Sequence, residues 1–255
     1  MGQTASAASA ASAAPAALVT GSARRIGAAI ARRLHAAGYD LALHYRDSAG
    51  DAQALAAELE GVRANSTLLL QADLVQFDRL PELVAQAIGR FGRLDALVNN
   101  ASAFYPTPFG ATTPAQWDEL FAVNARAPFF LAQAAAAHLA NANGAIVNIA
   151  DIHAERPLRG HAVYAMGKAA LLHMTRSLAL ELAPKVRVNA VSPGAILWPE
   201  GGKDPDAQAA LLARTPLGRT GTPQEIAEAV LWLLRDAGYC TGQTLHVDGG
   251  RMLGT

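Results

Sequence analysis

Along the chain, short apolar runs alternate with longer segments in which apolar residues recur at helical spacing. Each short run predicts a strand buried on both faces, and each longer segment predicts a helix with one apolar side. Strands are expected at 17–20, 40–45, 67–71, 95–99, 144–150, 186–191 and 244–247. Helices are expected at 25–37, 49–60, 77–91, 114–139, 161–182 and 223–234. The fourth helix should be irregular near Pro128, because proline lacks the N–H that continues a helix.

This order of elements predicts an α/β fold in one domain, residues 16–255. The sheet should be a Rossmann-type, doubly wound parallel sheet of about seven strands, with helices on both faces. Segment 195–216 interrupts the alternation with several Pro and Gly residues and is long for a connection, so it is expected to form a substrate lid. Residues 1–15 are almost all Ala and Ser and predict a disordered leader. The opening Met-Gly-Gln-Thr-Ala-Ser also matches a short myristoylation pattern.

Composition and charge exclude several classes of function. The formal net charge is +0, so nothing attracts the whole molecule to nucleic acid or to an anionic membrane surface. Cys240 is the single cysteine, so no intramolecular disulfide can form, which fits a reducing compartment and favours a cytoplasmic protein. No run is long and apolar enough to span a bilayer. The histidines are scattered, and no metal site is expected.

The first strand leads into Thr20-Gly21-Ser22-Ala23-Arg24-Arg25-Ile26-Gly27 and then a helix. Gly21 permits a tight turn, and Gly27 lets the helix pack close to the sheet. The helix N-terminus offers free N–H groups and a partial positive charge to a pyrophosphate. The strict G-x-G-x-x-G spacing is interrupted at Ala23 and Arg25, so an ordinary turn between strand and helix stays open as the alternative.

The end of the second strand indicates which dinucleotide is bound. It reads His44-Tyr45-Arg46, where an acidic residue would bind a ribose 2′-hydroxyl. Arg46 suits a 2′-phosphate, because a guanidinium makes paired contacts with phosphate oxygens, and this favours NADP(H) over NAD. Asp47 favours the opposite choice if it faces the ribose. His44 either lines the adenosine pocket or packs at the strand end.

Tyr164 and Lys168 stand four residues apart near the start of the long helix at 161–182, so their side chains share one face. A neighbouring ammonium is expected to lower the pKa of the phenol and to make the pair a proton donor or acceptor near neutral pH. A lone pair of this kind is often accidental. Other polar residues argue against chance, because Asn99-Asn100-Ala101 and Ser192-Pro193-Gly194 follow strands that end at the same edge of a parallel sheet.

Together these segments resemble the short-chain dehydrogenase/reductase family. The resemblance is carried by residues 20–27, 99–101, Asn124, Tyr164, Lys168, 193–194 and 247–250, and it extends from about residue 16 to the C-terminus. It implies a dinucleotide-binding and catalytic domain, with Asn124, Tyr164 and Lys168 in the catalytic set. It also implies a homotetramer. Cofactor contacts are expected from Gly21, Arg24, Arg25, Ile26, Gly27, His44, Tyr45, Arg46, Ser48, Asp73, Leu74, Asn100, Ala101, Ser102, Lys168, Pro193 and Gly194.

The family usually carries a serine thirteen residues before the tyrosine, and this chain has Asp151 there. A carboxyl group suits a nitrogen heterocycle, to which it can help supply a proton. Residues 24–25, 44–48 and 100–108 are similar to the pteridine reductases, in which the Phe104 position stacks a pterin against the nicotinamide. That resemblance implies a small pterin substrate bound by Arg25, Ser102, Phe104, Asp151 and Tyr164, and reduction of dihydropterins, with dihydrofolate a further possible substrate, by NADPH hydride with protons from Tyr164 and Asp151.

Alternatives remain open at each step. Phe104 can instead be a core aromatic, and Asp151 can cap a helix or pair with Arg156 or Arg159. The chain can be a carbonyl reductase of the same fold acting on a ketone, which Asp151 disfavours. It can also be a sensor that binds NADP(H) without turnover, which the Tyr164/Lys168 pair disfavours.

Overall fold

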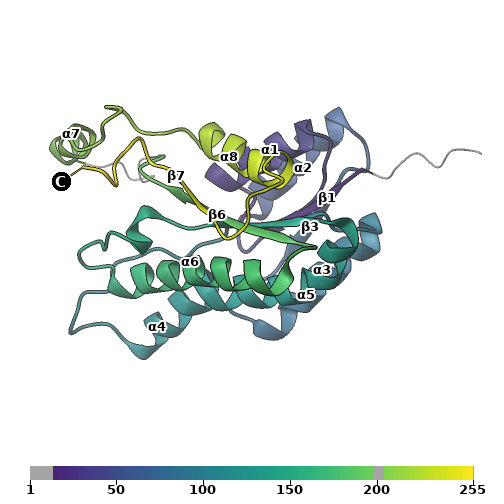
Figure 1. Ribbon diagram of the computed structural model, residues 1–255, viewed down its shortest axis with the longest axis horizontal. Helices are drawn as coiled ribbons and strands as arrows, with labels where there is room; N and C mark the ends of the chain where they lie inside the picture. The colour runs from purple at the N-terminus through teal and green to yellow at the C-terminus, as the bar shows by residue number, and fades with distance from the viewer. Residues whose placement is uncertain (1–13, 198–203, 255) are drawn as a thin grey trace, which may run out of the picture.

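A sheet of seven parallel strands forms the centre of the computed structural model, which describes residues 14–197 and 204–254 (Figure 1). The strands are β1 (Ala16–Val19), β2 (Asp40–Tyr45), β3 (Thr67–Gln71), β4 (Ala96–Asn99), β5 (Ala145–Ile149), β6 (Arg187–Pro193) and β7 (Thr244–Val247). Their order across the sheet is β3-β2-β1-β4-β5-β6-β7. The predicted strands and the predicted doubly wound architecture are confirmed, with strand ends that differ from the predicted ones by at most two residues.

Helices cover both faces of the sheet (Figure 1). They are α1 (Arg25–Ala36), α2 (Ala49–Val62), α3 (Leu80–Phe91), α4 (Pro114–Phe121), α5 (Ala127–Ala142), α6 (Ala162–Leu182), α7 (Pro205–Ala213) and α8 (Pro223–Arg235). An apolar core joins α1, α2 and α8 to one face, and a second core joins α3, α5 and α6 to the other. Ala, Leu and Val supply most of both cores.

The strand order reverses at β1, which pairs with β2 on one side and with β4 on the other. The connections that leave β1 and β4 therefore pass to opposite sides of the sheet, and a crevice opens beyond the carboxyl ends of these strands. The segments singled out in the sequence, at 20–27 and 99–101, follow β1 and β4 at this crevice.

The helix expected at 114–139 is divided, and its break lies before Pro128. α4 ends at Phe121, a π-helical turn occupies Ala122–Arg126, and α5 begins at Ala127. Pro128 has no N–H to donate to the carbonyl of Asn124, four residues earlier, so the regular α-helical pattern fails one turn ahead of the proline. The N–H of Ala127 instead reaches the carbonyl of Ala122, which is the wider spacing of a π-helix.

The segment expected to be an irregular lid, 195–216, contains a helix that the sequence reading missed. α7 begins after Asp204, whose carboxylate accepts the backbone N–H of Ala207 and caps the helix. No residue of α7 is buried, so it lacks the apolar stripe by which a helix is recognised in a sequence. Residues 198–203 of this segment, and residues 1–13 of the expected leader, lie outside the described residues.

Candidate active site

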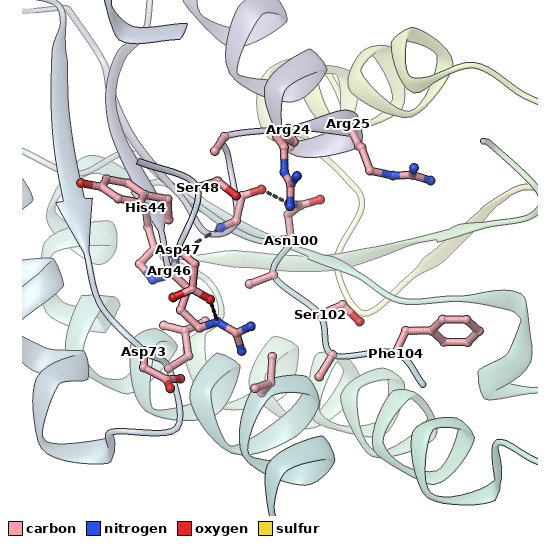
Figure 2. Close-up of a pocket in the computed structure, with 18 of the residues that line it drawn as sticks. Arg24, Arg25, His44, Arg46, Asp47, Ser48, Asp73, Asn100, Ser102 and Phe104 are labelled. Atoms are coloured by element: carbon pink, nitrogen blue, oxygen red, sulfur yellow. Dashed lines mark hydrogen bonds and ion pairs between the residues drawn. The ribbon is translucent and has the colours of Figure 1, made fainter. Parts of the chain in front are cut away.

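A cavity of about 590 Å³ lies at the crevice beyond β1, β2 and β4 (Figure 2). Its lining comes from the turn after β1, the end of β2, the segment after β3, the segment after β4, and α4 with its π-helical extension. The lining residues are Gly21, Ala23, Arg24, Arg25, Ile26, Gly27, His44, Tyr45, Arg46, Asp47, Ser48, Asp73, Leu74, Asn100, Ala101, Ser102, Ala103, Phe104, Tyr105, Glu119 and Val123. In Figure 2, Arg46 and Asp73 lie at one end and Phe104 at the other.

The turn between β1 and α1 is held so tightly that two of its positions require glycine. Gly21 has a φ of +61°, and a Cβ there would lie 3.0 Å from the Cα of Ala101. A Cβ on Gly27 would lie 2.1 Å from the carbonyl oxygen of Gly21. The side-chain amide of Asn100 donates to the carbonyl oxygens of Thr20 and Gly21, each at 2.9 Å. These contacts place the N-terminus of α1 at the cavity, where its N–H groups suit an anion.

We expect Gly27→Ala to destabilise the protein by about 1–3 kcal/mol, the cost of overpacking, and to weaken NADPH binding. The added methyl group would overlap the Gly21 carbonyl, so the turn would have to move. Thermal melting and a fluorescence titration with NADPH measure the two effects.

Gly89→Ala is the matched control for this prediction. Gly89 lies exposed in α3, and a Cβ there would meet nothing within 4 Å. Its replacement by alanine should raise helix stability by up to about 1 kcal/mol and leave NADPH binding unchanged. If Gly27→Ala matched this control in both measurements, the requirement for glycine at position 27 would be wrong.

His44 joins the turn to two strands. Its Nδ1 accepts the N–H of Gly21 at 3.1 Å, and its Nε2 lies 3.1 Å from the carbonyl oxygen of Ala72, which it can meet only as a donor. Burial lowers the pKa of His44 to about 4, so the ring is neutral at neutral pH. The ring packs at the strand end and also lines the cavity, and its contact with the adenosine stays a prediction.

Basic side chains surround the part of the cavity next to α1 and β2. Arg46 is exposed at the end of β2, and its Nε donates to the carboxylate of Asp47 at 2.6 Å. Arg24 lies 3.7 Å from the carboxylate of Asp51. Arg25 begins α1 with a φ of +53°, a left-handed conformation that is unfavourable for a residue with a Cβ. Its side chain extends toward the Phe104 end of the cavity (Figure 2).

The segment after β4 carries Ser102 and Phe104 to the opposite end of the cavity. Phe104 is 55% exposed, which excludes the alternative that it is a core aromatic. Its ring stacks on His161, with centroids 4.7 Å apart and planes inclined by 14°. It also makes a T-shaped contact with the ring of Tyr164, with centroids 4.7 Å apart and planes inclined by 79°. The structure therefore brings Phe104 and Tyr164 into direct contact.

Asn124 fastens this segment from the π-helical turn. Its side-chain amide donates to the carbonyls of Ala103 and Leu120, at 2.9 and 3.0 Å, and its oxygen accepts the hydroxyl of Ser102 at 2.7 Å. The side chain is buried and every polar atom of its amide has a partner. Asn124 thus lies against the cavity lining and fixes the orientation of Ser102.

Tyr164 and Asp151 are joined by a short hydrogen bond. The phenol donates to Oδ2 of Asp151 at 2.7 Å, from the first turn of α6 to the residue that follows β5 and Ala150. Oδ1 of the same carboxylate accepts the backbone N–H of His153 at 2.8 Å, which caps the short 3-10 helix Ile152–Ala154. Asp151 therefore does cap a helix, but with one oxygen alone, and its other oxygen accepts the hydrogen bond of the phenol. The guanidinium of Arg156 instead donates to backbone carbonyls near the C-terminus.

The expected lowering of the Tyr164 pKa is wrong, because the net shift is upward. The structure raises the pKa of Tyr164 well above its usual value, through burial and the charge and hydrogen bond of Asp151. A hydrogen bond with Ser102 acts the other way and is outweighed. Lys168 is fully buried and donates to the carbonyl of Ile149 at 2.8 Å, and its Nζ lies 5.9 Å from the Tyr164 ring centroid. Burial lowers the pKa of Lys168 to about 8. Tyr164 is thus a protonated donor across the neutral range.

Comparison with known proteins fits this arrangement. A family model described as enoyl-(acyl carrier protein) reductase matches residues 21–251. The chain is 39% identical to "Pteridine reductase 1" of Leishmania tarentolae, over 94% of this chain and 96% of that protein. It is 41% identical to a Streptomyces violaceoruber protein named as a ketoacyl reductase of granaticin polyketide synthase, with the same coverage. It is 38% identical to L-xylulose reductase of Bos taurus, over 92% of this chain and 95% of that protein.

The chain belongs to the short-chain dehydrogenase/reductase family. Members of this family are oxidoreductases that use NAD(P)(H). The cavity fits such a dinucleotide, because the closely packed turn at Gly21 and Gly27 presents the N-terminus of α1 to a pyrophosphate. Arg24 and Arg46 line the same cavity and add positive charge.

The short-chain dehydrogenase/reductase motifs fall into two groups in space. Every expected cofactor residue from the segments 21–27, 44–48, 73–74 and 100–102 lines the cavity. The buried Tyr164 and Lys168 and the half-buried Asp151 form a cluster that adjoins it through Ser102 and Phe104. Pro193 and Gly194 are not among the lining residues, and Gly194 packs instead against Asp248. Their contact with the cofactor stays a prediction.

Several lining residues were not singled out from the sequence. Ala23, Ala103 and Tyr105 lie inside segments that had been quoted, so their neighbours were the only signal. Glu119 and Val123 come from α4 and the π-helical turn, and Glu119 accepts the hydroxyl of Tyr105 at 2.9 Å. Glu119 lies five residues before Asn124, which the sequence analysis did single out. That short separation is the signal that could have indicated Glu119 as a lining residue.

The described residues contain neither a candidate metal site nor a candidate membrane-spanning helix. Among residues 14–197 and 204–254, no group of three or more His, Cys, Asp and Glu side chains is placed to hold a metal ion. In the same residues, no helix has the length and apolar character needed to cross a membrane.

Proposed function

We propose that this protein is an NADPH-dependent pteridine reductase that reduces dihydropterins. The observation that carries the proposal is the carboxylate of Asp151, held 2.7 Å from the hydroxyl of Tyr164 beside the exposed ring of Phe104. A serine at that position would give a neutral hydroxyl that orients a ketone oxygen. A carboxyl group paired with a phenol instead suits a ring nitrogen that must receive a proton.

The chemistry assigns a role to each group of this cluster. Reduction of a C=N bond adds one hydride to carbon and one proton to nitrogen, and the bound cofactor supplies the hydride. Tyr164 holds a proton at its Oη through the neutral range, since its pKa is raised. Asp151 accepts the hydrogen bond of that phenol and can pass a proton to it from solvent. The hydroxyl of Ser102, fixed by Asn124, also interacts with the phenol of Tyr164.

The aromatic ring of Phe104 supports a flat substrate. Phe104 lines the cavity and keeps 55% of its surface exposed, whereas most large apolar side chains of the described residues are buried. An exposed aromatic face at the mouth of a polar cluster favours stacking with a planar heterocycle.

The relatives support more than one substrate class. The similarity to "Pteridine reductase 1" of Leishmania tarentolae favours a pterin. The similarities to a ketoacyl reductase and to L-xylulose reductase favour a ketone. Overall identity does not separate these classes, because the values lie within a few per cent of each other. Asp151 and Phe104 both favour the pterin.

Arg46 supports NADPH as the cofactor, and its removal gives a prediction. A guanidinium at the end of β2 can bind a 2′-phosphate, and a hydrogen bond to a charged group contributes about 1.5–3 kcal/mol. We expect Arg46→Ala to lower the ratio of kcat/KM with NADPH to that with NADH by about 10- to 100-fold. Steady-state kinetics with each nucleotide measure this ratio.

Arg79→Ala is the matched control, since Arg79 pairs with Glu82 in an exposed salt bridge and does not line the cavity. It should leave the nucleotide ratio unchanged. An unchanged ratio in Arg46→Ala as well would show that Arg46, which contacts Asp47, is not available to the phosphate.

An absorbance assay tests the proposed function. NADPH oxidation is followed with dihydrobiopterin, with dihydrofolate and with ketones that include a 3-oxoacyl thioester and a ketose, and NADH serves as the control nucleotide. We expect kcat/KM for dihydrobiopterin to exceed that for every ketone by about tenfold or more. Turnover of a ketone with none of the pterin would establish a carbonyl reductase. Binding of NADPH with no turnover of any compound would indicate a nucleotide sensor.

A further inference from the structure

The segment that carries Phe104 is tied to the start of α6 at a second point. The backbone N–H of Thr107 donates to the carbonyl of Gly160 at 2.6 Å, and Thr107 forms an isolated parallel bridge with His161. Thr107 is buried, so this connection is shielded from water. Residues 104–107 and 160–164 therefore form one corner of the site, although they are far apart in the sequence.

His161 occupies the centre of this corner. It stands just before α6, three residues ahead of Tyr164, and its Nδ1 lies 3.1 Å from the carbonyl of Arg159. Its imidazole stacks on Phe104 with an interplanar angle of 14°. The stack holds the phenyl ring roughly perpendicular to Tyr164, whose plane is inclined to it by 79°. His161 therefore orients the Phe104 ring relative to the Tyr164 ring.

The stack also leaves surface for a ligand. A phenyl ring has two faces, and His161 covers one of them. Phe104 nevertheless remains 55% exposed and lines the cavity, so part of its ring is available to a flat molecule. Phe104 lies on an irregular segment, where a side chain has more freedom than in a helix or strand. A neighbour that orders the ring in advance lowers the entropy cost of binding.

We propose that His161 is a positioning residue that sets the plane of Phe104 and so determines the affinity for a flat heterocyclic substrate. The inference rests on the proposed function, since it concerns the pterin of that same site. His161 acts through Phe104 and takes no part in proton transfer. Its flat ring is the property that matters, and another flat ring should replace it.

Two substitutions at one position test this role. His161→Ala removes the stacking partner, and we expect the KM for dihydrobiopterin to rise by about 3- to 10-fold, the range for one aromatic pair. The kcat should stay within about threefold and the Kd for NADPH should not change, because the proton donors and the cofactor wall are untouched. His161→Phe keeps a flat ring and should restore the KM. His173→Ala, at an exposed position of α6, is the control and should behave as the wild type.

A crystal structure of His161→Ala gives a readout that does not depend on turnover. We expect the Phe104 ring to leave its present plane in that variant and to keep it in His161→Phe. An unchanged ring in His161→Ala, an unchanged KM, or a lower KM because His161 obstructs the substrate would each overturn the proposal. A wild-type protein inert toward every dihydropterin would contradict the proposed function instead, and the crystal structures would still decide the role of His161.

Discussion

Replacing Tyr164 by Phe is expected to lower kcat for dihydropterin reduction by about 10²–10⁴-fold, the range for a lost proton donor. The phenol keeps its proton through the neutral range, because burial and Asp151 raise its pKa. Phenylalanine keeps the ring that contacts Phe104 and removes the oxygen alone. The Kd for NADPH should change little, since the cavity wall next to α1 and β2 is built from other residues. Single-turnover kinetics and a nucleotide titration measure the two quantities.

Tyr239→Phe is the matched control for this experiment, because Tyr239 is fully exposed. It should leave kcat unchanged. The melting temperature of Tyr164→Phe should stay close to that of the wild type, which separates lost chemistry from lost structure. A kcat near normal in Tyr164→Phe would remove Tyr164 from its role as the proton donor.

Replacing Asp151 is expected to lower pterin turnover by about 10²–10³-fold, again within the range for general acid–base groups. Asp151→Asn keeps the size of the side chain and its capping oxygen but cannot relay a proton. Asp151→Ser restores the residue that the family usually carries and should improve reduction of a ketone relative to a pterin. Parallel kcat/KM measurements with dihydrobiopterin and with the ketone panel reveal this change of preference.

The stability of these variants provides the control. Oδ1 of Asp151 accepts the N–H of His153, and both Asn and Ser are good residues at such a capping position. The free energy of unfolding should therefore fall by no more than about 1 kcal/mol. Loss of pterin turnover in proportion to a large loss of thermal stability would mean that the carboxylate is structural.

Much of this site could be predicted because the fold sets it. Strands of a parallel sheet end at one edge, so residues after β1, β4 and β5 had to meet there once the alternation of elements was recognised. Gly21, Asn100 and Asp151 are each found at that edge. The four-residue spacing of Tyr164 and Lys168 likewise placed both side chains on one face of α6.

What the sequence did not predict depends on distances and burial. The spacing of Tyr164 and Lys168 says nothing about whether the ammonium or Asp151 lies closer to the phenol, and the carboxylate lies closer. The π-helical turn at Asn124 arises because Pro128, four residues later, has no N–H. The proline locates the break in the helix, but it does not say that the break is a π-helical turn. The stack of His161 on Phe104 joins segments 57 residues apart in the chain, and no local pattern encodes it.

A crystal structure of the complex with NADP⁺ and dihydrobiopterin tests the central claim most directly. We expect the pterin ring to lie against Phe104, with the Tyr164 hydroxyl or the Asp151 carboxylate within about 2.6–3.2 Å of one of its nitrogens. A complex in which the phenol turned toward solvent, or in which the pterin lay away from Phe104 and Asp151, would contradict the assignment.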